Sequence, residues 1–137
     1  MNEQAIKLAQ ITDPHLHANK DARMRGVNTC DTLQAVLRRI KTGSRRPDAI
    51  VATGDLVQDK TRGGYLRFAK MLKPLGVPVY CLPGNHDSPD VMRDQLNEAP
   101  FQFCGTASIG NWQLLMLNSH AENDNGGQFN TEQLAAI

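Results

Sequence analysis

The stretch Ala49-Ile50-Val51-Ala52-Thr53-Gly54-Asp55 places an apolar run directly before a glycine and an aspartate. A run of this length without regular polar alternation is typical of a strand buried on both faces, as in the middle of a parallel sheet. Glycine and aspartate favour turns, so the strand should end near Gly54. The segment therefore predicts a buried parallel strand with a carboxylate at its carboxyl end.

Two further segments repeat this arrangement. Ile6 to Thr12 is predicted as the first strand and precedes Asp13-Pro14-His15, and Val77 to Leu82 is predicted as the third strand and precedes Gly84-Asn85-His86-Asp87. Pro78 fits only near the start of its strand, where no ladder donor is needed. We therefore expect three successive strands with polar residues at their carboxyl ends.

Helical periodicity separates these strands. Apolar residues recur at i, i+3, i+4 and i+7 in two segments: Leu33, Val36, Leu37 and Ile40, and then Tyr65, Phe68, Ala69 and Leu72. Each pattern predicts a helix with one apolar stripe. Asn28 or Thr29 suits the N-cap of the first helix, and Gly76 suits the end of the second. The alternation predicts an α/β fold with a largely parallel sheet and flanking helices.

The rest of the chain predicts shorter elements. Ser88, followed by Pro89-Asp90, is expected to cap a helix that fades near Asn97. Trp112 to Leu117 predicts a fourth strand, with a weaker strand before it around Ser108-Ile109. Thr131 is expected to cap a final helix.

Composition limits the class of protein. A length of 137 residues suits one domain, and 40% hydrophobic with 21% charged residues is ordinary for a globular chain. A net charge of +1 indicates no nucleic-acid or membrane partner, and the chain has no run of about 18 apolar residues. Cys30, Cys81 and Cys104 lack a C-x-x-C spacing, which favours buried thiols in a reducing compartment. The cytoplasm is the expected location.

The polar residues at the strand ends are suited to metal binding, because ligands bind at the carboxyl ends of strands in open α/β sheets. Asp13 and His15 can offer an oxygen and a nitrogen to one ion. Asp55 can bridge to a second ion through its two oxygens. Asn85 offers a neutral amide oxygen, which suits Mn²⁺, Mg²⁺ or Fe²⁺, and His86 stands beside it, free to contact phosphate.

Each motif also has a purely structural interpretation. An isolated D-x-H segment is more often a turn with a solvated histidine, and Gly54-Asp55 and Pro83-Gly84-Asn85 are ordinary turn sequences. Three such turns at the ends of three successive strands, with complementary ligand types, favour a divalent metal site. His17 and His120 are interpreted as exposed loop histidines.

The motifs D-x-H, G-D and G-N-H-D, in this order, resemble the calcineurin-like metallophosphoesterase superfamily. Four segments are also similar in sequence to bacterial class III cyclic nucleotide phosphodiesterases of the cyclic AMP type: Leu8 to Leu16, Gly26 to Thr29, Ile50 to Leu56 and Leu82 to Asp87. The resemblance implies a layered α/β sandwich. It also implies a hydrolase for a small phosphodiester, with 3′,5′-cyclic AMP as the favoured substrate.

Carried over residue by residue, the resemblance implies that Asp13 and His15 bind one metal, Asp55 bridges two, and Asn85 binds the second. His86 would contact the phosphate and assist the leaving oxygen. The implied chemistry is a dinuclear metal-hydroxide mechanism, with two divalent ions that clamp the phosphate and lower the pKa of a water. Mn²⁺, Fe²⁺ and Mg²⁺ suit the ligands, and Zn²⁺ is also compatible.

The family pattern continues with an H-H-P-like segment and a G-H-x-H segment, and this sequence contains neither. We therefore expect residues 1–137 to be the N-terminal portion of a single metallophosphoesterase domain, supplying mainly one sheet and lacking the C-terminal portion. Two interpretations stay open: an active phosphodiesterase, or a catalytically impaired homologue that binds metal weakly or acts as an interaction module. An uncovered sheet face would favour self-association.

Overall fold

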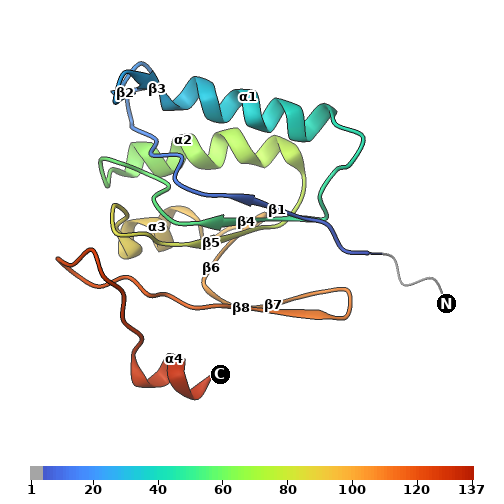
Figure 1. Ribbon diagram of the computed structural model, residues 1–137, viewed down its shortest axis with the longest axis vertical. Helices are drawn as coiled ribbons and strands as arrows, with labels where there is room; N and C mark the ends of the chain where they lie inside the picture. The colour runs from blue at the N-terminus through green and yellow to red at the C-terminus, as the bar shows by residue number, and fades with distance from the viewer. Residues whose placement is uncertain (1–4) are drawn as a thin grey trace.

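A four-stranded parallel sheet forms the centre of the computed structural model, which describes residues 5–137 (Figure 1). The strands lie in the order β1 (Leu8–Ile11), β4 (Ala49–Thr53), β5 (Val79–Leu82) and β6 (Phe101–Phe103). The α/β prediction and the three successive strands are confirmed, although β1 and β5 are shorter than predicted and Pro78 lies just before β5. The strand β6 was missed, because three residues between turns leave no clear periodicity.

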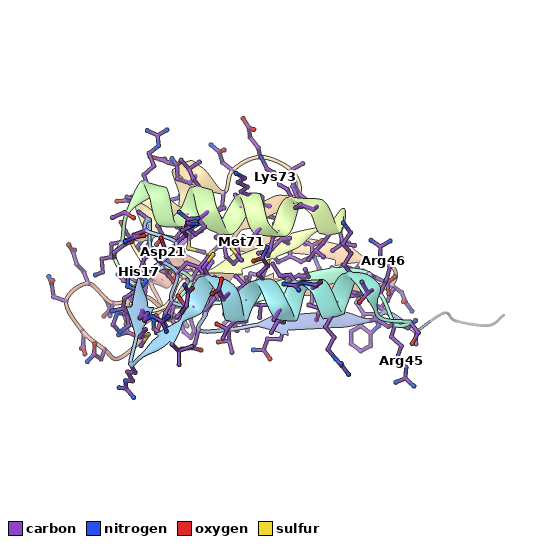
Figure 2. All side chains as sticks on the ribbon, turned by 90° about the horizontal axis from the view of Figure 1, so that it is seen from above. His17, Asp21, Arg45, Arg46, Met71 and Lys73 are labelled. Atoms are coloured by element: carbon purple, nitrogen blue, oxygen red, sulfur yellow. The ribbon has the colours of Figure 1, made fainter. Side chains whose placement is uncertain are left out.

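Three helices cover one face of this sheet (Figure 1). They are α1 (Thr29–Thr42), α2 (Arg62–Leu72) with the short 3₁₀ turn η1 (Lys73–Leu75), and α3 (Pro89–Gln95). Alternate strand residues, Ile50 and Ala52 in β4 and Val79 and Cys81 in β5, belong to the buried cluster beneath the helices. Seen from above, Met71 lies between α1 and α2, where its sulfur is 3.9 Å from the Cys30 sulfur (Figure 2).

The helix ends follow the predicted caps in part. The Asn28 side chain accepts a hydrogen bond from the Asp31 amide and so caps α1, as predicted. Gly76 ends η1 in the left-handed conformation, with φ of 66°. The predicted Ser88 cap is wrong in its chemistry, because the Ser88 hydroxyl makes no capping bond and the Ser88 amide donates to the Tyr65 hydroxyl instead.

A β-hairpin lies against the other face of the sheet. Its strands β7 (Gly105–Ile109) and β8 (Trp112–Met116) pair antiparallel with each other. Met116 packs with Ala49 and Tyr80 in a second small core. The hairpin therefore begins a second layer, so the expected uncovered sheet face is covered in part. Trp112 stays 67% exposed.

Two small elements complete the described residues. The strands β2 (Arg23–Met24) and β3 (Val27–Asn28) form a short antiparallel ribbon before α1. The last helix, α4 (Thr131–Ala135), is capped by Asn130 in a capping box, so the predicted cap at Thr131 is wrong by one residue. Within residues 5–137, none of the helices combines the length and the apolar character needed to cross a membrane.

Candidate metal centre

The candidate site lies where the polypeptide leaves β1 and β4. Beyond the strands, the Asp13 amide donates to the Gly54 carbonyl at 3.1 Å and the His15 amide donates to the Asp55 carbonyl at 3.0 Å. These bonds continue the parallel pairing and hold the two polar segments side by side. The neighbouring strands thus bring together residues that are about forty positions apart in the sequence.

Three of the predicted ligands have left-handed backbone. The φ angles are 53° for Asp13, 43° for His15 and 48° for Asp55. This conformation costs an L-residue roughly 1–2 kcal/mol, and backbone strain of this kind clusters at functional sites. Here it turns three side chains toward one another rather than along alternating strand directions.

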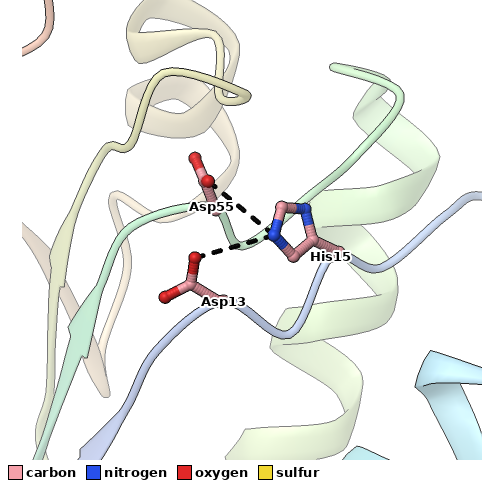
Figure 3. Close-up of side chains that lie close together, drawn as sticks. All are labelled: Asp13, His15 and Asp55. Atoms are coloured by element: carbon pink, nitrogen blue, oxygen red, sulfur yellow. Dashed lines mark ion pairs between the residues drawn. The ribbon is translucent and has the colours of Figure 1, made fainter. Parts of the chain in front are cut away.

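Asp13, His15 and Asp55 converge on one point (Figure 3). His15 Nε2 lies 3.6 Å from Asp13 Oδ1 and 3.7 Å from Asp55 Oδ2. The side chains of His15 and Asp55 are only 12% and 13% exposed, whereas that of Asp13 is 59% exposed. The triad is therefore open to solvent on the Asp13 side.

Gln58 orients the His15 ring and was missed by the sequence analysis. His15 Nδ1 is 2.8 Å from Gln58 Oε1. An amide oxygen accepts only, so Nδ1 carries a proton and Nε2 faces the two carboxylates. A polar partner of this kind fixes the tautomer of metal-binding histidines. No sequence motif marks Gln58, whose backbone is held by a bond from its amide to the Leu16 carbonyl.

The triad fits a divalent cation. Two carboxylate oxygens gathered around His15 Nε2 are favourable only where positive charge lies among them, and a divalent cation supplies that charge. The separations of 3.6 and 3.7 Å are too long for hydrogen bonds, but they are close to the roughly 3.0–3.6 Å between ligand atoms that bind one ion at about 2.1 Å. One nitrogen and two carboxylate oxygens suit Mn²⁺, Fe²⁺, Mg²⁺ or Zn²⁺.

The loop after β5 lies directly against Asp55. The His86 amide donates to Asp55 Oδ1 at 2.9 Å, and the ring centres of His86 and His15 are 5.2 Å apart. A Cβ on Gly84 would collide with the Asp55 carboxylate and amide, and a Cβ on Gly54 would lie 2.9 Å from the Gly84 backbone. Both glycines are therefore needed for the close approach of the two loops.

Asn85 lies on the same loop, between two residues that meet Asp55. Its sequence neighbours Gly84 and His86 both contact Asp55. The Asn85 side chain is half-buried and donates through Nδ2 to Asn125 Oδ1 at 3.1 Å. The structure thus gathers Asp13, His15 and Asp55 in one cluster and places His86 and Asn85 on the adjoining loop.

The Asp87 side chain holds the loop after β5 in place through hydrogen bonds. The fully buried Asp87 carboxylate accepts four hydrogen bonds, from the amides of Leu56, Val57 and Gly84 and from the Tyr65 hydroxyl. Burial raises the pKa of Asp87, and the donors act in the opposite direction. Burial, together with the Asp87 charge, raises the pKa of Tyr65. Asp87 therefore joins the Gly84 loop to the segment that follows Asp55.

The two remaining histidines are not simple exposed residues. His120 is half-buried and its Nδ1 lies 2.9 Å from the Gly84 carbonyl, so the interpretation as an exposed loop histidine is wrong. His17 is also half-buried, with its Nδ1 shielded from solvent, and its carbonyl accepts from Arg67 Nε. Neither residue belongs to the Asp13, His15 and Asp55 cluster.

The structure is a parallel α/β sheet with a nitrogen and carboxylate cluster at its strand ends that could hold a divalent metal ion. Residues 6–136 match the family model of the calcineurin-like phosphoesterases. The chain belongs to this family, as the sequence motifs predicted.

Curated relatives agree with this assignment. The chain is 43% identical over 130 residues to the 3′,5′-cyclic adenosine monophosphate phosphodiesterase of Haemophilus influenzae, covering 94% of this chain and 47% of the relative. It is 38% identical over 133 residues to the protein of the same name from Escherichia coli K12, covering 96% and 48%. A 3′,5′-cyclic-nucleotide phosphodiesterase of Nostoc is 37% identical over 120 residues, covering 87% and 45%. The chain spans about half the length of these relatives.

Proposed function

We propose that this protein is a metal-dependent phosphoesterase that hydrolyses a small phosphodiester, with 3′,5′-cyclic AMP as the favoured substrate. The observation that carries the proposal is the cluster of His15 Nε2 with the carboxylates of Asp13 and Asp55, held by left-handed backbone at the strand ends. The choice of cyclic AMP rests on the names of the relatives from Haemophilus influenzae and Escherichia coli.

The residues divide into two ligand groups. In this proposal Asp13 and His15 hold the first divalent ion, Asp55 is shared, and Asn85 belongs to the second. When bound, two such ions supply positive charge that stabilises the phosphoryl oxygens and lowers the pKa of an attacking water. Asp55 Oδ1 already accepts the His86 amide, while its Oδ2 faces His15. One carboxylate therefore links both halves of the site.

His86 is the proposed catalytic residue. Its amide is anchored on Asp55 and its ring meets the His15 ring edge to face, at an interplanar angle of 77°. Both contacts fix the position of the imidazole beside the triad. From there it contacts the phosphate and assists the departure of the leaving oxygen.

The domain and location complete the proposal. We treat residues 1–137 as the N-terminal portion of a single metallophosphoesterase domain, an interpretation that stays a prediction. Cys30, Cys81 and Cys104 are free thiols. Unpaired thiols accord with a reducing compartment, and we propose the cytoplasm.

The decisive test is Mn²⁺-dependent hydrolysis of a chromogenic phosphodiester and of cyclic AMP by the 137-residue chain. Asp55→Asn is the sharpest variant, because asparagine tolerates the left-handed backbone at this position while removing the charge. We expect at least about a hundredfold loss of turnover. Asp21→Asn is the control, since the Asp21 side chain is 75% exposed and its ion pair, with Lys20, is a loose one at 4.0 Å. Equal turnover in wild type and Asp55→Asn would refute the proposal.

A second candidate function is an interaction module that associates through the hairpin layer. It is favoured by the exposed apolar residues Trp112 and Leu115, which are 67% and 40% exposed on β8. These two side chains lie on opposite sides of β8, because they are three residues apart in a strand. Self-association would bury the exposed apolar surface of the hairpin. Sedimentation across a concentration series is expected to show a dimer that Trp112→Lys converts to monomer. A wild-type chain that stays monomeric throughout the series would exclude self-association.

A further inference from the structure

The segment between β8 and α4 is folded onto the candidate site. Residues 118–128 of this segment are called the 118–128 loop below. The Gln128 amide donates to the Ser119 carbonyl at 3.1 Å, and His120 and Gly127 form an isolated antiparallel bridge, so the two ends of the loop are closed together. A Cβ on Gly127 would lie 3.1 Å from the Ser119 carbonyl oxygen, so this closure is tight.

Two contacts connect the 118–128 loop to the Gly84-Asn85-His86 segment. Asn85 Nδ2 donates to Asn125 Oδ1 at 3.1 Å. His120 Nδ1 is 2.9 Å from the Gly84 carbonyl, and because a carbonyl only accepts, this nitrogen is the donor. The loop therefore holds both the backbone before Asn85 and the Asn85 side chain itself.

The orientation of the Asn85 amide matters for metal binding. Rotating the amide by half a turn exchanges its oxygen and nitrogen, and only the oxygen can bind a cation. An acceptor next to Nδ2 favours the orientation in which the nitrogen faces the loop and the oxygen faces away. Asn125 supplies that acceptor.

We propose that Asn125 is a positioning residue that fixes the Asn85 amide with its oxygen available to a divalent cation. The inference rests on the proposed function, because it takes Asn85 as a metal ligand. His120 supports the same arrangement by holding the Gly84 carbonyl. The 118–128 loop contributes none of the ligands in the carboxylate and histidine cluster, yet it sets the presentation of a neighbouring one.

The test compares three variants of the 137-residue chain by Mn²⁺ titration. Asn125→Ala removes the acceptor, and we expect Mn²⁺ affinity to fall about tenfold, as is usual when the partner of a ligand is removed. Asn125→Asp keeps an acceptor in either side-chain orientation and should restore affinity to the wild-type level or above. The double variant Asn123→Asp with Asn125→Ala adds the charge without the contact and should remain weak.

A second readout separates this inference from the proposed function. The side-chain NH₂ signals of Asn85 in a metal-free ¹H–¹⁵N spectrum should shift in Asn125→Ala and return toward the wild-type position in Asn125→Asp. Unchanged signals in Asn125→Ala would overturn the inference whatever the metal does, as would a double variant that binds Mn²⁺ as well as Asn125→Asp. A wild-type chain that binds no Mn²⁺ would instead refute the metal site of the proposed function.

Discussion

Replacing Asp87 with asparagine tests the connection that holds the Gly84 loop on the rest of the site. Asp87 Oδ1 accepts from the Val57 amide and the Tyr65 hydroxyl, and Oδ2 accepts from the amides of Leu56 and Gly84. Asparagine keeps one oxygen and places an NH₂ group against the other pair of donors. At least one buried backbone N–H then has no acceptor, because only the Tyr65 hydroxyl can rotate away.

The magnitude follows from these contacts. Each orphaned buried donor costs about 1–3 kcal/mol, and each lost bond to a charged acceptor about 1.5–3 kcal/mol. Burying the charged Asp87 carboxylate costs free energy, and this cost raises the pKa of Asp87. The neutral amide of asparagine avoids part of that cost. We therefore expect Asp87→Asn to lower the free energy of unfolding by about 3 kcal/mol. For a chain of this size, that corresponds to roughly 10 °C in Tm.

The assay is urea unfolding followed by circular dichroism at neutral pH. Asp90→Asn is the matched control, because it makes the same chemical change three residues along the chain on a side chain that is 89% exposed. Its effect should stay within about 0.5 kcal/mol. A loss below about 1 kcal/mol in Asp87→Asn would show that the four bonds do not hold the loop as argued.

Three further predictions concern the glycine contact, the histidine tautomer and the thiols. Gly84→Ala should lower stability and weaken Mn²⁺ binding at least tenfold, because its Cβ would collide with Asp55. Gln58→Leu should weaken Mn²⁺ binding about tenfold by releasing the His15 ring, whereas Gln58→Glu, which keeps the acceptor, should not. Burial raises the pKa of the Cys104 thiol to about 11. Its alkylation at pH 8, followed by mass spectrometry, should therefore be about a hundredfold slower than that of an unburied cysteine and should accelerate about tenfold per pH unit.

Each of these predictions has a control variant or an outcome that would contradict it. Gly26→Ala is the control for Gly84→Ala. It adds left-handed strain at φ of 84°, but its Cβ would have nothing within 4 Å, so Mn²⁺ binding should be unaffected. Equal Mn²⁺ affinity in Gln58→Leu and Gln58→Glu would contradict the tautomer argument. Alkylation of Cys104 as fast as that of a free cysteine in a short peptide would contradict the burial argument.

The amino-acid sequence by itself determined the order of the main strands and helices and the positions of the candidate ligands. Apolar runs and 3.6-residue periodicity are local signals, since they reflect how one element meets a core. Parallel strands place their carboxyl ends at one edge, so the polar residues after β1, β4 and β5 could be grouped before any contact was known. Asp13, His15 and Asp55 do lie together in the structure.

Only the tertiary structure decided which residues support these ligands. Gln58 reaches His15, and Asn125 reaches Asn85 from forty residues away, through contacts that no periodicity encodes. His120 had the sequence context of an exposed loop but lies against Gly84. The addition of β6 to the sheet likewise depends on a partner that is distant in the sequence, the strand β5. Hydrogen-bond partners and strand neighbours are set by where the folded backbone passes, so they cannot be assigned until the fold brings the segments together.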